Sequence, residues 1–332
     1  MEDQKIISQL KKKIYSPVYL LHGEEPFFID KISDYIEEHV LDESEKAFNQ
    51  TVVYGKDTEP FQLISMLKEY PAGAPYKVVI VKEAQDIKNL ENLENYLEKP
   101  VPTSILVLSF KHKKVDKRKK FYLSIKKKGV IFESKPVYEN KIPQWINDYV
   151  HSQGYTITDK SVLLLTEYLG NNLGKITNEV QKLLINIPKD KQIDENDIEK
   201  NIGISKDFNV FELQDALGIK DVLKVNRIIN YFAANEKEHH AIKVIAMLYA
   251  FFHKLFLYHF LEDKSKNTAA SKLGVPPYFV HKYAAASRKY PTRKLSDIMH
   301  HLRVYDLKAK GLNNDSTSSG ELLKELIFKI LH

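Results

Sequence analysis

The stretch VYLLHGEEPFFIDK at 18–31 has residue types and a spacing that could bind phosphate: an apolar run, a glycine, and then an amphipathic segment. A phosphate-binding loop at such a strand-to-helix turn reads G-x-x-x-x-G-K-[ST]. Its amides cradle phosphates, its lysine reaches the β and γ oxygens, and its hydroxyl holds Mg²⁺. Counted from Gly23, the second glycine, the lysine and the hydroxyl positions hold Phe28, Ile29 and Asp30. We therefore expect a degenerate loop that binds no phosphate.

Two further features of the sequence argue against nucleotide hydrolysis. Glu24 and Glu25 stand where a triphosphate would lie, and their negative charge would repel it. The apolar run KVVIV at 77–81 is followed by Lys82 and Glu83, whereas a hydrolysing site has a magnesium-binding acid before the catalytic glutamate. An active ATPase or nucleotide kinase is thus a disfavoured alternative.

The positive charge of the chain is concentrated in one tract, residues 111–128. It holds ten Lys or Arg residues against one Asp, a local charge of +9, so the rest of the chain carries −3 of the total +6. A solvated helix face and a polyanion-binding surface both fit such a tract. The tract follows the strand-like SILVLSF, which places its start at the carboxyl edge of a parallel sheet. The side chains predicted to meet DNA phosphates are Lys113, Lys114, Lys117, Arg118 and Lys120.

Other chemistry is not indicated by the sequence. There is no cysteine, which excludes disulfides, thiolate zinc sites and cysteine nucleophiles and fits a cytoplasmic location. The pairs His239–His240 and His300–His301 are adjacent, so on a helix they diverge by about 100° and make poor chelates. Residues 269–290 have helix-turn-helix spacing, but an apolar second helix start favours packing over DNA reading. We expect no catalytic residue, no metal and no cofactor.

The elements that must position these residues fall into two patterns. Up to about residue 138, short continuous apolar runs alternate with helical periodicity, which is typical of a parallel sheet covered on both faces. After Pro136 only helical patterns remain, and the apolar run at 241–261 is interrupted by Lys and His, so we expect a buried helix and no membrane contact. The predicted domains are an α/β domain at 1–138, a small helical domain at 139–205 and an all-α domain at 206–332.

These segments, in this order, resemble the clamp-loader branch of the AAA+ proteins, and within it the delta-subunit family of bacterial DNA polymerase III. The resemblance extends over nearly the whole chain and is carried by VYLLHGEEPFFIDK, KVVIVKEAQ, VDKRKKFY, GNNLGKITNEVQKLL, FNVFELQDALG, KLGVPPYFVHKY and YDLKAKG. It implies an AAA+-like α/β domain without a functional P-loop, then a small helical domain and an all-α oligomerisation collar.

The resemblance also implies a function. Members of this family bind the sliding clamp (beta) and open it for loading onto primed DNA, join the other loader subunits through the C-terminal domain, and leave ATP hydrolysis to those subunits. The chain would then be a component of the DNA polymerase III holoenzyme without intrinsic activity. The alternative is a stand-alone nucleic-acid-binding protein that uses the tract at 111–128.

The family's apolar clamp-binding loop matches EYPAGAPYK at 69–77, which departs from the family pattern. Small residues stand where bulky apolar side chains would be expected to fill a pocket on the clamp, at roughly 1.5 to 3 kcal/mol each. Either neighbouring bulky residues replace them or the clamp contact has shifted. The residues assigned to clamp binding are Met66, Leu67, Tyr70, Ala72, Gly73 and Tyr76.

Overall fold

A computed structural model describes residues 2–314 and 316–332 of the chain. The chain divides into two compact units, Met1–Tyr149 with Leu169–Asn178, and Val150–Tyr168 with Glu179–His332. This division runs through three of the helices that follow the sheet. The domain boundaries predicted at 138 and 205 fall between regular elements and remain a prediction.

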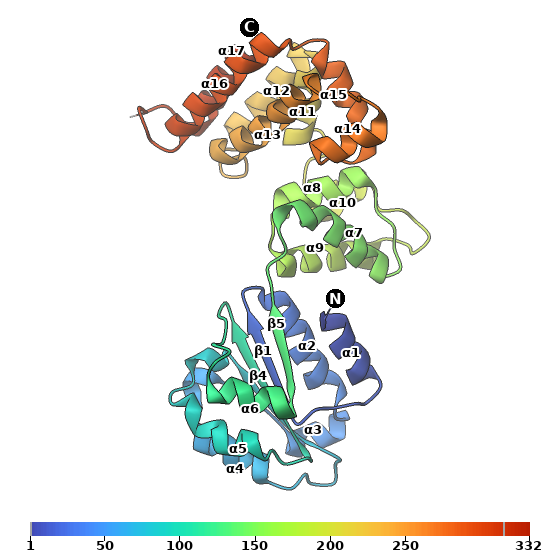
Figure 1. Cartoon of the computed structure of the whole chain (residues 1–332). Coiled ribbons are helices and arrows are strands. Elements are labelled where there is room, and N and C mark those ends of the chain that lie inside the picture. Colours follow the sequence, from blue (N-terminus) through green and yellow to red (C-terminus); the bar gives the residue numbers. More distant parts are fainter. Residues whose placement is uncertain (1, 315) are drawn as a thin grey trace. The chain divides into compact units, whose positions relative to one another are not determined.

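The first unit is built on a parallel five-stranded sheet, with strands in the order β2-β3-β4-β1-β5 (Figure 1). Its strands are β1 (Val18–Gly23), β2 (Gln50–Tyr54), β3 (Lys77–Lys82), β4 (Ser104–Lys111) and β5 (Val130–Ser134). Its helices are α1 (Glu2–Lys11), α2 (Pro26–His39), α3 (Glu43–Asn49), α4 (Pro60–Lys68), α5 (Glu94–Glu98) and α6 (Lys120–Lys128). Burial of β1, β3 and β4 on both faces explains why their sequences are continuous apolar runs.

The two edges of this sheet carry different loops. Because all pairings are parallel, the segments that precede strands meet at the amino edge and those that follow strands meet at the carboxyl edge. The loop 69–76 precedes β3 and lies at the amino edge, whereas Glu24, Glu83 and Lys113 follow strands and lie at the carboxyl edge. The degenerate P-loop and the predicted clamp loop are therefore at opposite edges of the sheet.

All regular elements described after β5 are helical. Between Ile142 and Ile202 the longer ones are α7 (Ile142–Ser152), α8 (Asp159–Leu169), α9 (Leu173–Asn186) and α10 (Glu195–Ile202). The segment 206–332, called the collar region below, contains the remaining helices. They are α11 (Val210–Ile219), α12 (Val222–Ala234), α13 (Ala241–His259), α14 (Lys266–Leu273), α15 (Val280–Ser287), α16 (Thr292–Ala309) and α17 (Ser319–Leu331). Its core is one apolar cluster drawn from α11 to α17.

Helix α13 departs in part from the expectation that it is buried. Its length and composition alone would allow it to span a membrane, but 44% of its most apolar window is buried in the chain, as in a core helix. Phe252 and Leu255 are buried, while Tyr249, Leu257 and Phe260 are exposed. The helix packs most extensively on α16 and keeps an apolar stripe open to solvent.

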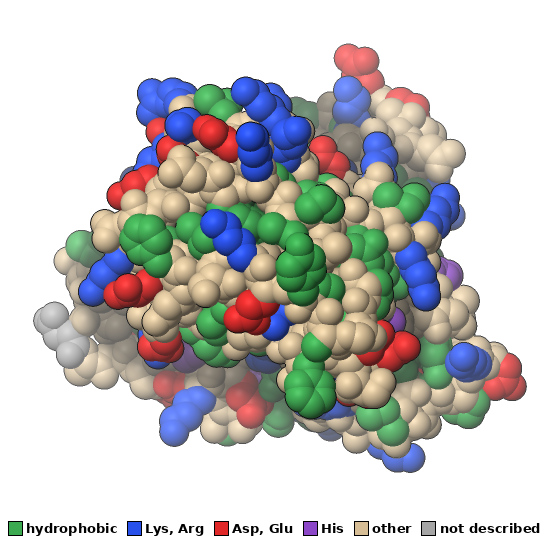
Figure 2. All heavy atoms as spheres, turned by 90° about the horizontal axis from the view of Figure 1, so that it is seen from below, with side chains coloured by type: hydrophobic (Ala, Val, Ile, Leu, Met, Phe, Trp, Pro, Cys, Tyr) green, Lys and Arg blue, Asp and Glu red, His purple; other side chains and the backbone are tan. Residues whose placement is uncertain are grey.

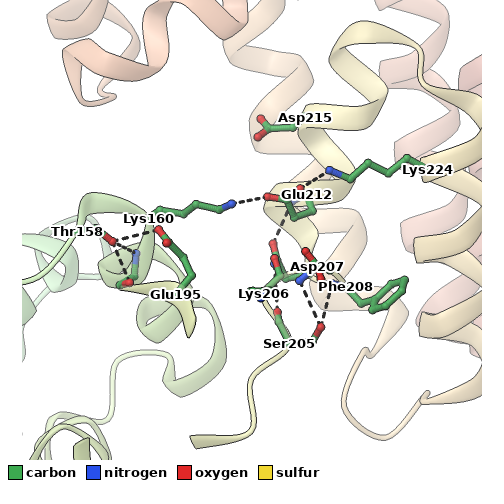
Figure 3. Close-up of polar contacts among 12 residues, drawn as sticks. Thr158, Lys160, Glu195, Ser205, Lys206, Asp207, Phe208, Glu212, Asp215 and Lys224 are labelled. Carbon is green, nitrogen blue, oxygen red and sulfur yellow. Dashed lines mark hydrogen bonds and ion pairs between the residues drawn. The ribbon is translucent and has the colours of Figure 1, made fainter. Parts of the chain in front are cut away.

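A buried carboxylate joins α8 to the collar helices within the second unit (Figure 3). The carboxylate of Glu212 on α11 forms ion pairs with two lysines. It accepts a hydrogen bond from the ammonium of Lys160 on α8 at 2.7 Å and another from the ammonium of Lys224 on α12. Burial works to raise the pKa of Glu212, but the hydrogen bonds from the two lysines outweigh it and hold the pKa below its usual value. The ion pairs thus connect three helices.

Candidate functional site

The turn after β1 is closed by its own backbone. The Gly23 N–H donates to the Lys113 carbonyl at 3.1 Å, and the Glu24 N–H donates to the Ser134 carbonyl at 3.0 Å. The Phe27 N–H donates to the Glu25 carboxylate at 3.0 Å, which caps α2. Three amides of the turn, those of Gly23, Glu24 and Phe27, are thereby already satisfied.

The close approach of β5 also fixes the identity of Gly23. Its φ of +141° is disfavoured for other residues, and a Cβ there would lie 2.0 Å from the Ser134 carbonyl oxygen. This glycine therefore allows the close contact between the turn and β5.

The side chains at the degenerate P-loop positions are either buried in the core or form an ion pair. Phe28 and Ile29 are buried in the core beneath α2. Asp30 pairs with Lys111 at 2.8 Å, and Lys111 also lies 3.6 Å from Glu83. Burial opposes the charge of Lys111, but the two carboxylates leave its pKa raised. The Lys111 ammonium thus lies between Asp30, at the hydroxyl position of the P-loop pattern, and Glu83, the acid that follows β3.

Four of the five residues predicted to meet DNA form ion pairs with acids, and three of these acids come from other parts of the chain. Four ion pairs are formed: Lys114–Glu24 at 2.7 Å, Lys117–Glu133 at 2.7 Å, Arg118–Asp116 at 2.9 Å and Lys120–Glu98 at 3.1 Å. The pKa of Asp116 falls to about 2 because Arg118 donates hydrogen bonds to it. Of the five predicted side chains, Lys113 alone makes no ion pair with a described residue. The cationic surface at 113–120 is therefore much weaker than the sequence implies.

The predicted clamp-binding residues separate into three groups. Leu67 is fully buried in the core beside Ser104, whose hydroxyl donates to its carbonyl, so its side chain is excluded from a surface contact. This part of the assignment is corrected, because Leu67 faces the sheet from α4. Met66 packs partly on the same core, and Tyr76 packs edge-on against Tyr15. Tyr70, Ala72 and Gly73 are exposed.

The loop 69–76 is held in place by a buried asparagine. The side chain of Asn49, at the end of α3, accepts the Ala72 N–H at 2.7 Å and donates to the Ala72 carbonyl at 3.0 Å. Lys77 donates to the Phe48 carbonyl at 3.2 Å and to Glu69 at 2.8 Å. The end of α3 and the loop therefore lie side by side.

Exposed aromatic side chains gather at this amino edge. Tyr70, which follows α4, is 90% exposed, and Phe48, which precedes β2, is 74% exposed. Phe61 is also 68% exposed, but it lies at the start of α4 after β2 and so on the side of the carboxyl edge. Figure 2, which views the molecule from below Figure 1, shows apolar side chains in several patches among lysines and acids. A groove of about 410 Å³ at the same edge is lined by Tyr15, Tyr76 and three prolines. Single exposed apolar side chains are common on protein surfaces, whereas several close together often mark a protein-binding site. This surface is therefore a candidate protein-binding site.

Phe48 and Phe61 were not identified from the sequence. Phe48 lies in α3, a helix that the sequence analysis did not predict, and Phe61 begins α4 within an apolar pattern that favours burial. The pattern of Phe61, Ser65 and Lys68, which share one helix face, could have indicated its exposure.

The described residues contain no group of three or more His, Asp or Glu side chains that could hold a metal ion. The parallel sheet order and the all-helical continuation together define an AAA+-like fold, in which the strand-to-helix turn lacks the residues of the P-loop pattern.

Comparisons with known proteins narrow this class. A sequence model of the DNA polymerase III delta subunit matches residues 19–135, and one of its C-terminal domain matches residues 207–326. DNA polymerase III subunit delta of Bacillus subtilis (strain 168) is 24% identical over 338 residues, which cover 96% of this chain and 93% of the relative. A probable DNA polymerase III subunit delta of Aquifex aeolicus (strain VF5) is 23% identical over 278 residues, 79% and 77% of the two chains.

Among solved structures, the DNA clamp loader delta protein of Bacillus subtilis matches 99% of both chains with 23% identity and a TM-score of 0.54. The fold is therefore shared along the whole chain. The chain belongs to the DNA polymerase III delta subunit family.

Proposed function

We propose that this chain is the clamp-loader subunit that binds the sliding clamp and holds it open for loading onto primed DNA, without hydrolysing ATP itself. The observation that carries the proposal is the contrast between the two edges of the sheet. The carboxyl edge is closed by backbone hydrogen bonds and by the Asp30–Lys111–Glu83 ion pairs, whereas the amino edge presents exposed aromatic side chains.

The proposed clamp surface consists of the exposed aromatics of the amino edge with the remaining predicted residues: Phe48, Met66, Tyr70, Ala72, Gly73 and Tyr76. Tyr and Phe anchors suit this role because each buries a large area when it enters a partner's pocket. The other loader subunits would pack on the collar region, for which the apolar stripe on α13 is available. Membership of the delta-subunit family supports the proposal that this chain acts as part of a clamp-loader complex in the cytoplasm.

Clamp binding is tested by measuring the affinity of the purified chain for the sliding clamp of its own organism. Replacement of both Tyr70 and Phe48 by Ala is expected to weaken binding by tenfold or more, about 1.4 kcal/mol or greater. Tyr138→Ala is the matched control, because Tyr138 is 76% exposed but follows β5 at the other edge. Binding unaffected by the double substitution would place the clamp contact elsewhere, and no binding by the unaltered chain would refute the proposal.

The absence of hydrolysis is tested separately by titrating the chain with Mg-ATP. We expect no saturable binding in the micromolar range, because the turn amides are already bonded and acids face the site. Tight binding would restore the nucleotide-hydrolysing alternative.

A further inference from the structure

A second cationic cluster lies in the collar, away from the tract at 111–128. Residues 281–310 hold eight Lys or Arg against two Asp. Two basic pairs flank one turn: Arg288 and Lys289 follow α15, and Arg293 and Lys294 begin α16. Their spacing places four cations within seven residues, with Asp297 one helical turn further on.

Unlike the tract at 111–128, this cluster is not neutralised. Arg288, Lys289 and Arg293 are exposed, and their side chains make no ion pair or hydrogen bond with any residue that the structure describes. The Lys294 ammonium reaches only the Lys329 carbonyl at 3.4 Å. Two cations in the first turn of α16 also oppose the helix dipole. The arrangement works against the stability of the isolated chain and suits an anionic partner.

The turn that carries the cluster is firmly anchored. The buried Tyr290 donates its hydroxyl hydrogen to the Leu217 carbonyl at 2.7 Å, and its own carbonyl accepts a hydrogen bond from His259 at 2.9 Å. The Lys220 ammonium lies 5.0 Å from the centre of the Tyr290 ring, which adds a fifth cation to the same place. The charges are therefore held together by packing, so a ligand need not order the turn on binding.

We propose that Lys220, Arg288, Lys289, Arg293 and Lys294 form a collar site for the phosphate backbone of DNA. A protein-binding surface normally has an apolar centre with charges at its rim. Between Arg288 and Asp297 the exposed residues are polar or charged apart from Pro291, so a polyanion fits better than a protein partner. This inference rests on the proposed function, which brings the chain to primed DNA, and it moves the main DNA contact from 113–120 to the collar.

The test measures binding of fluorescent single-stranded and duplex oligonucleotides across a range of salt concentrations. The variant carries Arg288→Ala, Lys289→Ala and Arg293→Ala, and the matched control carries Lys126→Ala, Lys127→Ala and Lys128→Ala, which removes equal charge from exposed positions of the other unit. We expect the variant to lose tenfold or more in affinity at low salt. The slope of log K against log salt should become shallower by about 2, since each lost phosphate contact removes about 0.7 to 0.9. The control should change affinity less than twofold.

Three results would overturn the site: unchanged affinity and slope in the variant, an equal loss in the control, or intact DNA binding with failed assembly into the loader. The last result would assign the cluster to an acidic neighbouring subunit. Clamp affinity of the same variant is measured in parallel and should be unchanged. Loss of DNA binding alone therefore tests this site, whereas lack of clamp binding by the unaltered chain tests the proposed function.

Discussion

Asn49 shows how a single buried side chain can position a binding surface that it does not join. It is fully buried and makes three hydrogen bonds, one to the Glu45 carbonyl at 3.1 Å and two to the backbone of Ala72. The two bonds to Ala72 mimic the pairing of a strand neighbour. The conformation of the loop 69–76, and hence the position of Tyr70, depends on this contact.

Asn49→Ala is expected to lower the free energy of unfolding by about 1 to 3 kcal/mol, because it removes three hydrogen bonds of a buried side chain and leaves the Ala72 amide and carbonyl without these partners. It should also weaken clamp binding, since the loop that carries Tyr70 loses its anchor. Urea unfolding and clamp titration measure the two effects. The exposed Asn92→Ala serves as the control. If stability falls while clamp affinity is kept, the loop does not contribute to the clamp surface.

Glu167 on α8 is an acid in an environment that disfavours its charge. One carboxylate oxygen accepts the Val210 N–H at 3.2 Å, and the other is buried without a partner among the described residues. Burial raises the pKa of Glu167 to about 7, against the lowering effects of that hydrogen bond and of nearby Lys243. The folded chain therefore holds this proton more tightly than the unfolded chain does.

The pH dependence follows from this shift. Between pH 4.5 and about 7, Glu167 keeps a proton in the folded state that it has lost in the unfolded state. The contribution of Glu167 to the free energy of unfolding therefore falls as the pH rises through this range, and it is constant above about pH 7. Glu167→Gln keeps an acceptor for Val210 and removes the charge. We expect the variant to gain on the order of 2 to 3 kcal/mol at pH 8 and little at pH 4.5. Urea unfolding at several pH values is the measurement, and a pH-independent difference would contradict it; exposed Glu91→Gln is the control.

At the scale of elements, the strands were predicted well and two helices were missed. The apolar runs at the start of VYLLHGEEPFFIDK, in KVVIV and in SILVLSF form β1, β3 and β4, because strands buried on both faces have continuous apolar sequences. Helices α1 and α3 were not predicted; α3 has seven residues with little apolar periodicity and begins with a capping box.

The candidate sites were harder to predict than the elements. Loss of P-loop chemistry could be seen from Phe28, Ile29 and Asp30, since a missing lysine and a missing glycine are local features. The neutralisation of Lys114 and Lys117 could not, because their partners Glu24 and Glu133 are distant in sequence or on another strand. Exposure of Phe48 and burial of Leu67 likewise depend on tertiary packing.

The ion pairs between β4 and α2 give a prediction at this scale. Lys111→Ala is expected to destabilise the first unit by about 1 kcal/mol, because Asp30 and Glu83 lose the cation between them. In a double-mutant cycle with Asp30→Ala, the two losses should fall short of additivity by about 0.5 kcal/mol or more. Unfolding in urea measures each corner of the cycle, and strict additivity would show that the pair contributes nothing. Clamp affinity should stay unchanged, since the pair lies at the other edge.

At the scale of the molecule, Glu212 couples successive helices of the second unit. Its side chain is only 10% exposed, and the lysines that hold it come from α8 and from α12 (Figure 3). Close by, the Val210 N–H and the ammonium of Lys243 both bond to Glu167. The side chains of Lys160, Glu167, Glu212, Lys224 and Lys243 thus connect α8 with α11, α12 and α13.

Glu212→Ala is expected to reduce the free energy of unfolding by about 1 to 2 kcal/mol, because two half-exposed lysines lose a buried partner. Amide hydrogen exchange should also become faster at 203–210, where local opening would begin. Glu321→Ala is the control, since its pair with Lys324 at 2.8 Å is exposed and within one helical turn. Unchanged exchange in the Glu212 variant would mean that packing alone joins these helices.

The closed turn after β1 makes the loss of nucleotide chemistry difficult to reverse in evolution. A chain that regained the missing lysine and the second glycine would still have its Gly23 and Glu24 amides bonded to Lys113 and Ser134. Lys111 would also keep its ion pairs with Asp30 and Glu83. The return of any one P-loop residue would therefore have little effect by itself. This arrangement fits the proposed function, in which a neighbouring subunit supplies the hydrolysis.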